Sequence, residues 1–263
     1  MDTEKVVDHI VNWLKDYAVN ANIKGFTIGI SGGIDSAVTS TLCAKTGLDL
    51  LCLEMPIHQA KSQVSRASNH IEWLKANFNS VNRLEVDLTP VFDTFVAAVP
   101  AVEKEEDRFM SLANTRARLR MTTLYYFAAL NGYLVAGTGN KVEDFGVGFY
   151  TKYGDGGVDL SPIADLLKTE VYEIAKFLGI NEEIIKAAPT DGLWGDDRTD
   201  EDQIGASYPE LEWAMQMKEE NKTIDDFSGR NREVFNIFNK FNLANQHKML
   251  PIPICKIPIR FLR

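Results

Sequence analysis

Residues 29–36 read Gly-Ile-Ser-Gly-Gly-Ile-Asp-Ser, and this glycine-rich stretch lies between a predicted strand and a predicted helix. The apolar run at 26–30 predicts the strand, and we expect the helix to begin near Asp35. Glycines let the backbone turn its N–H groups towards one point, where they join the unpaired N–H groups and positive dipole end of the helix. Such a junction stabilises an anion without a lysine in the loop. The sequence therefore predicts a site for the pyrophosphate part of a nucleotide.

Two commoner phosphate-binding motifs do not match this loop. A Walker loop requires G-x-x-x-x-G-K followed by Ser or Thr, and no stretch of the chain supplies it. A dinucleotide-binding turn requires G-x-G-x-x-G after the strand, and Ser31 stands in place of the second glycine. Glu54 ends the second predicted strand about where a ribose-binding acid would lie, and it keeps a Rossmann domain as the weaker alternative.

Asp35 makes the loop chemically specific. An aspartate here repels a bare phosphate unless a Mg²⁺ ion lies between the two. The alternative is that Asp35 caps the helix, but the adjoining Ser31, Gly32, Gly33 and Ser36 favour the metal. The pattern SGGIDS resembles the pyrophosphate loop of the ATP pyrophosphatase superfamily, whose members cleave ATP between its α and β phosphates to adenylate a substrate.

The charge of the chain argues against a nucleic-acid partner. Lys and Arg total 28 against 37 Asp and Glu, a net charge of −9, whereas duplex or tRNA binding draws most of its affinity from neutralised phosphates. The chain lacks a long apolar run and its first twenty residues are rich in charge, so we expect no membrane span, no signal peptide and a cytoplasmic location.

Cys43, Cys52 and Cys255 are too scattered for a disulfide framework or a zinc site, and we expect buried, reduced thiols.

Apolar periodicity predicts alternating helices and strands over the first half of the chain. We expect helices at 3–19, 35–45, 60–76, 92–99 and 108–130, and strands at 26–30, 48–53, 81–88 and 133–137. This alternation favours an α/β fold in which helices flank a doubly wound parallel sheet, similar to the adenine nucleotide alpha hydrolases. Ligands of such sheets bind beyond the carboxyl ends of the strands, where residues 31–36 lie together with the stretches after Leu53 and Gly137.

Beyond residue 160 we expect a mostly helical C-terminal part within a single domain, residues 1–263. Apolar spacing predicts helices around 171–178, 208–220 and 229–246. Residues 189–207 show no sustained apolar periodicity and form a longer segment than a simple connecting loop, which favours a lid or binding loop. The proline-rich tail after Leu250 cannot form a helix, and we expect it to pack against the body or a second subunit.

Two glycine-rich stretches after the fourth predicted strand narrow the choice of substrate. One reads Gly-Thr-Gly-Asn-Lys-Val-Glu over 137–143, and the other reads Lys-Tyr-Gly-Asp-Gly-Gly-Val-Asp over 152–159. Together they resemble the signature of the NAD synthetases, and with the 31–36 loop the likeness runs through nearly the whole chain. The resemblance implies that nicotinic acid adenine dinucleotide, ATP and ammonia are converted into NAD, AMP and pyrophosphate through an acyl adenylate.

The resemblance also implies how ATP and its metal are held. The residues that it assigns to ATP are Gly29, Ser31, Gly32, Gly33, Ile34, Asp35, Ser36, Thr138, Lys168 and Thr190. It assigns Mg²⁺, the expected cofactor, to Asp35 and Glu143, and it makes Lys168 a catalytic cation near the phosphates. By propensity alone Thr138 would be a helix cap, Lys168 a solvated lysine and Thr190 a turn residue.

A further set of residues is implied for the dinucleotide and for ammonia. The resemblance assigns the dinucleotide to Arg118, Lys152, Asp159, His247 and Lys248. At 100° per residue Arg118 points well away from Arg116 and Arg120 on the same helix, so we expect these two at the surface or in salt bridges. Asp155 or Asp159 could bind ammonium or take its proton; the sequence does not decide, and we put Asp155 forward as the catalytic carboxylate.

Departures from the family pattern bear on the nitrogen source. Many bacterial members read GTDHAAE where this chain reads GTGNKVE, a variant that keeps Glu143 and resembles archaeal and glutamine-dependent members. The sequence contains no amidase domain, so free ammonia is the expected nitrogen source, with a separate glutaminase as the alternative. The resemblance implies a homodimer. There are three alternative interpretations: a GMP synthetase-like enzyme, a tRNA-thiolating enzyme, and a nucleotide-binding module without catalytic activity. A tRNA-thiolating enzyme would require reactive cysteines and a basic surface.

Overall fold

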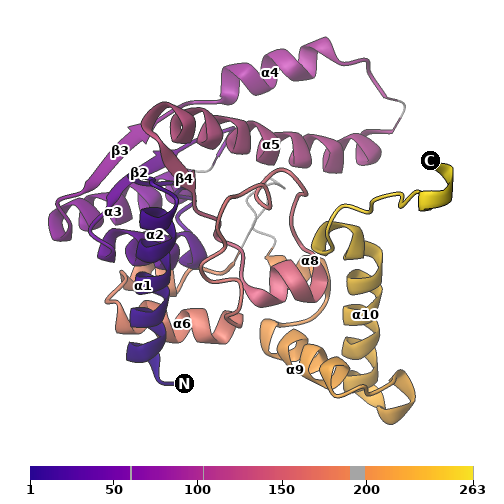
Figure 1. Ribbon diagram of the computed structural model, residues 1–263. Helices are drawn as coiled ribbons and strands as arrows, with labels where there is room; N and C mark the ends of the chain where they lie inside the picture. The colour runs from indigo at the N-terminus through magenta and orange to yellow at the C-terminus, as the bar shows by residue number, and fades with distance from the viewer. Residues whose placement is uncertain (60, 103, 190–198, 263) are drawn as a thin grey trace.

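A parallel sheet forms the centre of the protein in the computed structural model, which describes residues 1–59, 61–102, 104–189 and 199–262. Its strands lie in the order β3-β2-β1-β4 (Figure 1). They are β1 (Gly25–Gly29), β2 (Asp49–Glu54), β3 (Val81–Glu85) and β4 (Tyr133–Val135). The strand order reverses between β1 and β4, the switch point at which sheets of this kind bind their ligands.

The middle strand β1 is buried because both of its edges are paired and both of its faces are covered. It pairs with β2 from Gly25 and Asp49 to Gly29 and Leu53, and its first three residues also pair with β4. Phe26 and Ile28 are fully buried, as the continuous apolar run predicts. The end of β1 is therefore a rigid platform for the loop that follows it.

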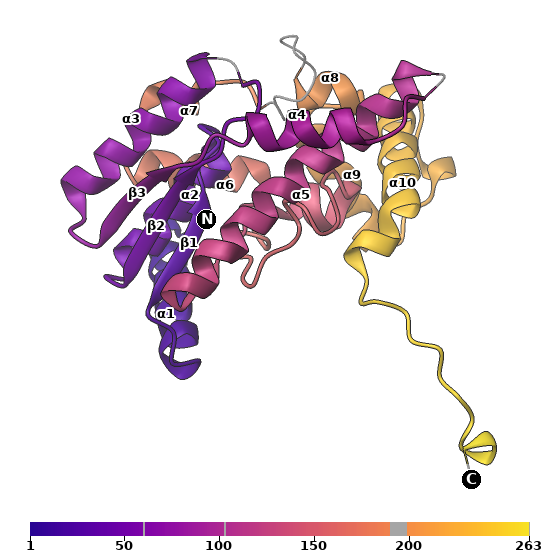
Figure 2. The ribbon, with the colours of Figure 1, turned by 90° about the horizontal axis from the view of Figure 1, so that it is seen from above.

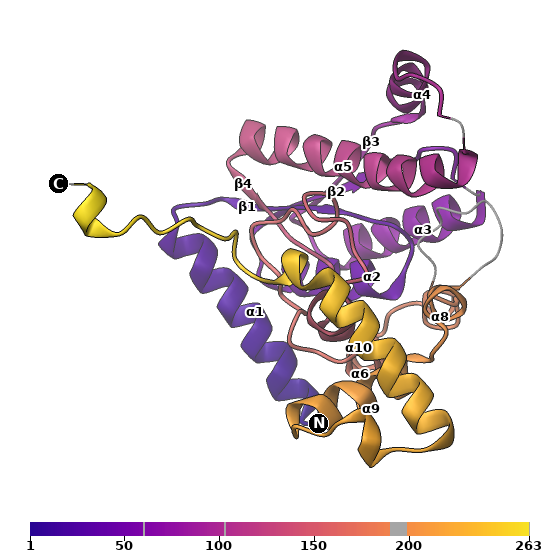
Figure 3. The same ribbon diagram turned by 90° about the vertical axis from the view of Figure 1, so that its right-hand side faces the viewer.

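Helices cover both faces of the sheet, which confirms the predicted doubly wound α/β fold (Figure 3). One face carries α1 (Thr3–Asn20), α2 (Ile34–Lys45), α3 (Lys61–Asn77) and α6 (Lys168–Phe177), and the other carries α5 (Glu105–Asn131) with α4 (Thr89–Ala98). The helix α1 buries Val7, Ile10 and Leu14 against this layer. These elements lie close to their predicted bounds because their apolar stripes are local in sequence.

The C-terminal helices pack beside the sheet around an apolar cluster of their own (Figure 1). They comprise the π-helical turn η1 (Val142–Val147), α8 (Asp200–Ile204), α9 (Tyr208–Glu219), α10 (Gly229–Met249) and the 3₁₀ turn η2 (Ile224–Asp226). The short α7 (Glu182–Ile185) instead buries Ile184 in the core beside the sheet, and the 3₁₀ turn η3 (Ile259–Phe261) lies exposed in the tail. Val234, Phe235 and Phe238 of α10 are buried in this cluster. The helical C-terminal part is thus as predicted.

Two local expectations are wrong. The third strand ends at Glu85 and not at residue 88, because the chain turns to follow the segment after β2, where Leu88 N–H donates to the Pro56 carbonyl at 3.0 Å. Part of the expected loop at 189–207 is the helix α8, whose N-cap Thr199 accepts from Asp202 N–H; residues 190–198 lie outside the described part.

The tail after Leu250 does not pack against the body of the described chain. It runs away from α10 with its apolar side chains exposed, Ile254 to 80% (Figure 2), and its prolines remove the N–H groups that would join it to a sheet or helix. Cys255 is exposed there, which corrects the expectation of three buried thiols; Cys43 and Cys52 are buried as expected. Among the described residues no helix is long and apolar enough to cross a membrane.

Candidate active site

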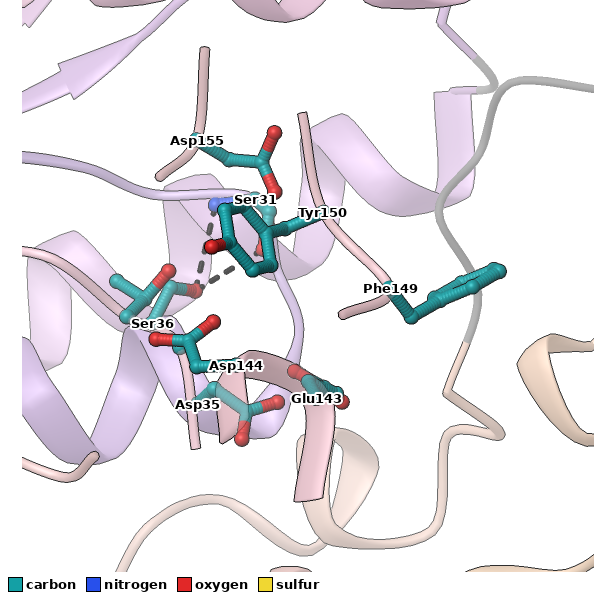
Figure 4. A pocket seen from close by; sticks show the side chains of 10 residues that line it. Ser31, Asp35, Ser36, Glu143, Asp144, Phe149, Tyr150 and Asp155 are labelled. Carbon is teal, nitrogen blue, oxygen red and sulfur yellow. Dashed lines mark hydrogen bonds between the residues drawn. The ribbon is translucent and has the colours of Figure 1, made fainter. Parts of the chain in front are cut away.

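The predicted phosphate loop follows β1 and leads directly into α2. Gly32 lies in the left-handed region with φ +82°, which an L side chain rarely adopts. Ser31 and Ser36 bridge the loop, with 3.1 Å between their hydroxyl oxygens (Figure 4). Gly33 N–H donates to Ser31 Oγ at 3.2 Å. Gly33 is the N-cap, so Asp35 is the second residue of the helix and not its cap. The capping alternative for Asp35 is therefore wrong.

A cavity of about 110 Å³ opens between this loop and the segments that follow β4. Side chains from three parts of the sequence point towards it (Figure 4). Its lining residues are Ser31, Asp35, Ser36, Thr138, Gly139, Glu143, Asp144, Phe149, Tyr150 and Asp155. The structure thus brings together the loop, the acid of the first glycine-rich stretch and the aspartate of the second, as the carboxyl-end rule predicts.

Lys168, the first residue of α6, joins the two acids that the sequence assigns to the metal. Its ammonium lies 2.6 Å from Asp35 Oδ2 and 3.0 Å from Glu143 Oε1, and its side chain is only 2% exposed. Burial alone would lower the pKa of this lysine, but the two carboxylates raise it well above its ordinary value. Lys168 is therefore a permanently charged buried cation, and its interpretation as a solvated lysine is wrong.

Two further residues hold this centre and were not found from the sequence. Tyr208 O–H donates to Glu143 Oε1 at 2.6 Å, and the Tyr208 ring lies under the Lys168 ammonium, 4.8 Å from it. Asn140 donates its amide N–H to Asp35 Oδ1 at 3.1 Å. No local pattern marks Tyr208 as a site residue, because it comes from α9, far along the chain. Asn140 could have been found only from its place inside the GTGNKVE stretch.

The cavity carries an excess of negative charge. Burial, Glu143, Asp155 and Asp35 together raise the pKa of Asp144 to about 8, and burial raises the pKa of Asp155 above its ordinary value. Asp144 lies against Gly139, where a Cβ atom would come within 2.2 Å of its Oδ2, so a side chain at position 139 would displace this carboxylate. A wall of this kind attracts cations and repels anions that arrive without one.

Asp35 and Glu143 fit the binding of Mg²⁺ with a nucleotide. Mg²⁺ in such enzymes is usually held by one or two carboxylates together with substrate phosphates, and not by a cage of protein ligands alone. Both acids contact the same ammonium group, which puts their oxygens around one point beside the phosphate loop. Among the described residues there is no cluster of three or more metal-binding side chains, in keeping with a metal that needs the phosphates.

Four residues assigned to the dinucleotide come together at the end of α10. Arg118 of α5 donates to the Lys152 carbonyl at 3.4 Å, and the Lys152 ammonium donates to the His247 carbonyl. Lys248 donates to the carbonyls of Gly148 and Tyr150 at 2.8 and 2.7 Å, and so ties α10 to the cavity wall.

Asp159 lies apart from the cavity. Its two carboxylate oxygens accept from the Tyr125 hydroxyl at 3.0 Å and from Val135 N–H at 2.8 Å. Asp155, by contrast, lines the cavity while its Oδ1 accepts from Thr151 N–H at 3.0 Å. Of the two candidate carboxylates for ammonium, the geometry therefore favours Asp155.

Three further residues were assigned from the sequence. Arg120 is half-buried and pairs with no carboxylate among the described residues; it donates instead to the Met55 carbonyl at 3.0 Å and to Gln59 Oε1 at 3.2 Å. Arg116 stacks over the Phe92 ring at 4.4 Å. Thr190, assigned to ATP, lies outside the described residues.

The Rossmann alternative depended on Glu54 as a ribose-binding acid. Glu54 is buried and forms an ion pair with Arg83 of the neighbouring strand at 2.5 Å, so its carboxylate already has a partner within the sheet. The pair contradicts this alternative.

The sequence model of the family described as NAD synthase matches residues 6–251. The chain belongs to the NAD synthase family. This family member is 38% identical to the NH(3)-dependent NAD(+) synthetase of Methanosarcina mazei over 97% of its own length and 98% of the relative. It is also 38% identical to the enzyme of that name from Carboxydothermus hydrogenoformans, over 86% of this chain and 91% of the relative.

A solved structure shares the whole architecture of this NAD synthase family member. The NMN synthetase of Francisella tularensis superposes with a TM-score of 0.85 at 30% identity, over 98% of this chain and 100% of the other. Family membership makes the protein an ammonia-dependent ligase of NAD synthesis and disfavours the GMP synthetase-like, tRNA-thiolating and silent-module interpretations.

Proposed function

We propose that the protein amidates nicotinic acid adenine dinucleotide with ammonia and ATP, and releases NAD, AMP and pyrophosphate. The observation that carries this proposal is the meeting of the phosphate loop, the Asp35–Lys168–Glu143 centre and Asp155 around one cavity. The relatives' printed name, NH(3)-dependent NAD(+) synthetase, supports ammonia as the nitrogen source. This chain covers 98% of the Methanosarcina relative, which supports a single domain that uses ammonia.

In the first step the nicotinate carboxylate oxygen attacks the α phosphorus of ATP and pyrophosphate leaves. Negative charge grows on the leaving group and must be met by fixed donors. The loop supplies backbone N–H groups beside the N-terminus of α2, which also bears a partial positive charge. Mg²⁺, when bound by Asp35 and Glu143, would offset the charge of the phosphates.

In the second step ammonia attacks the carbonyl carbon of the acyl adenylate, loses a proton, and AMP leaves. Ammonia arrives in water mostly as ammonium, which an acid-lined cavity attracts. Asp155 faces the cavity with a raised pKa, so its carboxylate can hold ammonium and accept its proton. Asp144 lies on the same wall, where its pKa of about 8 leaves the carboxyl group largely protonated at neutral pH.

The dinucleotide would lie along the surface formed by Arg118, Lys152 and the end of α10. These groups are cationic, as the pyrophosphate bridge of a dinucleotide requires. Their mutual contacts hold them within reach of one ligand. Thr190 is proposed as an ATP contact on the family pattern alone.

A second candidate substrate is nicotinic acid mononucleotide. The Francisella protein, with its TM-score of 0.85, is named NMN synthetase, so a close structural likeness extends to an enzyme of that product. The chemistry at the carboxylate is the same for both substrates, and only the adenylyl half of the dinucleotide differs.

One assay tests both candidates. Purified protein is incubated with Mg-ATP, ammonium chloride and either nicotinic acid adenine dinucleotide or the mononucleotide, and the products are separated by chromatography. We expect NAD from the dinucleotide with a kcat/KM well above that for the mononucleotide. The reverse ratio would make the protein an NMN synthetase, and no amide from either substrate would contradict the proposal.

We also propose a homodimer working in the cytoplasm. Tyr126 and Leu130 of α5 are 64% and 68% exposed, and the tail presents further apolar side chains, so the monomer leaves large apolar groups in water. The tail sequence contains Lys256, Arg260 and Arg263 and no acidic residue, so its charge is opposite in sign to the net charge of −9 of the whole chain. Light scattering after size exclusion should give twice the chain mass at micromolar concentration; a monomer at that concentration would contradict the dimer.

A further inference from the structure

A side chain outside the phosphate loop donates a hydrogen bond to the backbone of that loop. Arg66 of α3 donates from Nε to the Gly32 carbonyl at 3.3 Å. Among the described residues, no other side chain beyond residues 31–36 donates to the backbone of that loop. Arg66 is half-buried, and no carboxylate in the described part of the chain pairs with it.

This contact bears on the peptide unit that joins the two glycines. In a trans peptide the carbonyl and the N–H point in opposite directions, so a donor that fixes the Gly32 carbonyl also fixes the Gly33 N–H. Glycine adopts several backbone conformations at little cost, so at Gly32, with φ +82°, the Arg66 contact adds to the hydrogen bond from Gly33 N–H to Ser31 Oγ in holding this peptide unit. A cation against the carbonyl also polarises the peptide and strengthens the N–H as a donor.

The charges around the loop give Arg66 a second effect. Asp35, Glu143, Asp144 and Asp155 line the cavity, whereas the ammonium of Lys168 is held by Asp35 and Glu143. A polyphosphate at the loop therefore faces an acidic wall. The guanidinium of Arg66 lies against the loop itself and offsets this charge from the α3 side.

We infer that Arg66 is a positioning residue for the phosphate loop, one that orients the Gly32–Gly33 peptide and so sets the affinity for the pyrophosphate part of ATP. The inference rests on the proposed function. It concerns affinity for one part of one substrate, so it predicts a loss that is confined to ATP and to pyrophosphate.

The test uses Arg66→Met, which removes charge and donor at similar length, and Arg66→Lys, which keeps both. We expect R66M to raise KM for ATP and the inhibition constant of pyrophosphate about tenfold, the size expected for one hydrogen bond to a charged group. KM for the dinucleotide should stay within about twofold, and R66K should recover most of the loss. Lys75→Met, on the exposed end of α3, is the matched control and should leave all three constants unchanged.

A second measurement separates this inference from the proposed function. Stabilisation of the full chain by inorganic pyrophosphate in a thermal unfolding assay needs no turnover, and we expect R66M to lose most of the shift that the wild type shows. If the wild type makes no NAD but R66M still loses this shift, only the proposed function fails. An unchanged shift in R66M, or an equal rise in KM for both substrates, would overturn the role of Arg66.

Discussion

The ammonium of Lys168 lies 2.6 Å from Asp35 Oδ2, on a side chain that is almost completely buried, and the same ammonium reaches Glu143. One cation therefore balances two carboxylates that would otherwise repel each other. The same two acids are the proposed ligands of Mg²⁺, so the metal and the lysine act on the same oxygens. The next two predictions test this shared binding of Lys168 and Mg²⁺ to the same carboxylates.

Replacing Lys168 by Met leaves two buried carboxylates without a counter-ion. Breaking a buried ion pair by removing one partner costs about 3–5 kcal/mol, so K168M should lose that much unfolding free energy in EDTA. Mg²⁺ should then raise the Tm of K168M more than that of the wild type, because the acids are free to bind it. The control is Lys141→Met, since Lys141 pairs with the exposed Asp165. Equal Mg²⁺ shifts in K168M and wild type would contradict this role.

Replacing Tyr208 by Phe removes one hydroxyl from the same centre. Tyr208 O–H donates to Glu143 Oε1 at 2.6 Å, and a hydrogen bond to a charged group contributes about 1.5–3 kcal/mol. Tyr208 is neutral, so unlike Lys168 it does not compete with Mg²⁺ as a charge but orients the Glu143 carboxylate. Y208F should therefore bind Mg²⁺ more weakly, with the concentration for half-maximal activity raised several-fold. Activity measured against Mg²⁺ concentration checks this, with Tyr126→Phe at an exposed position as the comparison. A Y208F curve that overlays the wild type would remove Tyr208 from the site.

These long-range contacts explain which parts of the molecule could be predicted from the sequence. The strands, most helices and the phosphate loop depend on local patterns, and their places were predicted closely. Tyr208 meets Glu143 only after α9 has packed against η1, and Arg120 is half-buried where it donates to Met55 and Gln59 of the segment after β2. Neither event leaves a local signal. Asp35, Glu143 and Lys168, which the structure brings together at the cavity, were singled out because a family pattern carries long-range information that periodicity lacks.

Replacing Asp155 by Asn should separate the two chemical steps. An Asn side chain can still accept from Thr151 N–H, so the turn is kept while the negative charge is lost. We expect single-turnover release of pyrophosphate to stay within a few-fold of wild type, and NAD formation to fall about 100-fold, the lower end of general base effects. Equal loss of both steps would refute the role, and a selective loss in Asp159→Asn would move it to Asp159.

The buried His70 predicts how stability depends on pH. Its Nε2 lies 2.9 Å from Ser40 Oγ, and burial lowers its pKa to about 4 from an ordinary 6.5. Between these values the unfolded chain binds a proton that the folded chain does not, so stability falls as pH drops below 6.5. This group alone should cost about 2 kcal/mol between pH 7.5 and 5.0.

Urea unfolding of the wild type and His70→Gln at both pH values measures the effect. The variant should lose less stability on acidification by about 2 kcal/mol, whereas His9→Gln on the exposed face of α1 should behave as wild type does. An identical pH dependence in wild type and H70Q would show that His70 takes up a proton as readily when folded as when unfolded.

The most direct test of the proposed chemistry follows the phosphorus of ATP. Phosphorus NMR of a reaction with the dinucleotide, Mg-ATP and ammonium should show AMP and pyrophosphate appearing together, in amounts equal to the NAD formed. ADP and inorganic phosphate as the primary products would contradict cleavage between the α and β phosphates, and with it the assignment of residues 31–36 to the departing pyrophosphate.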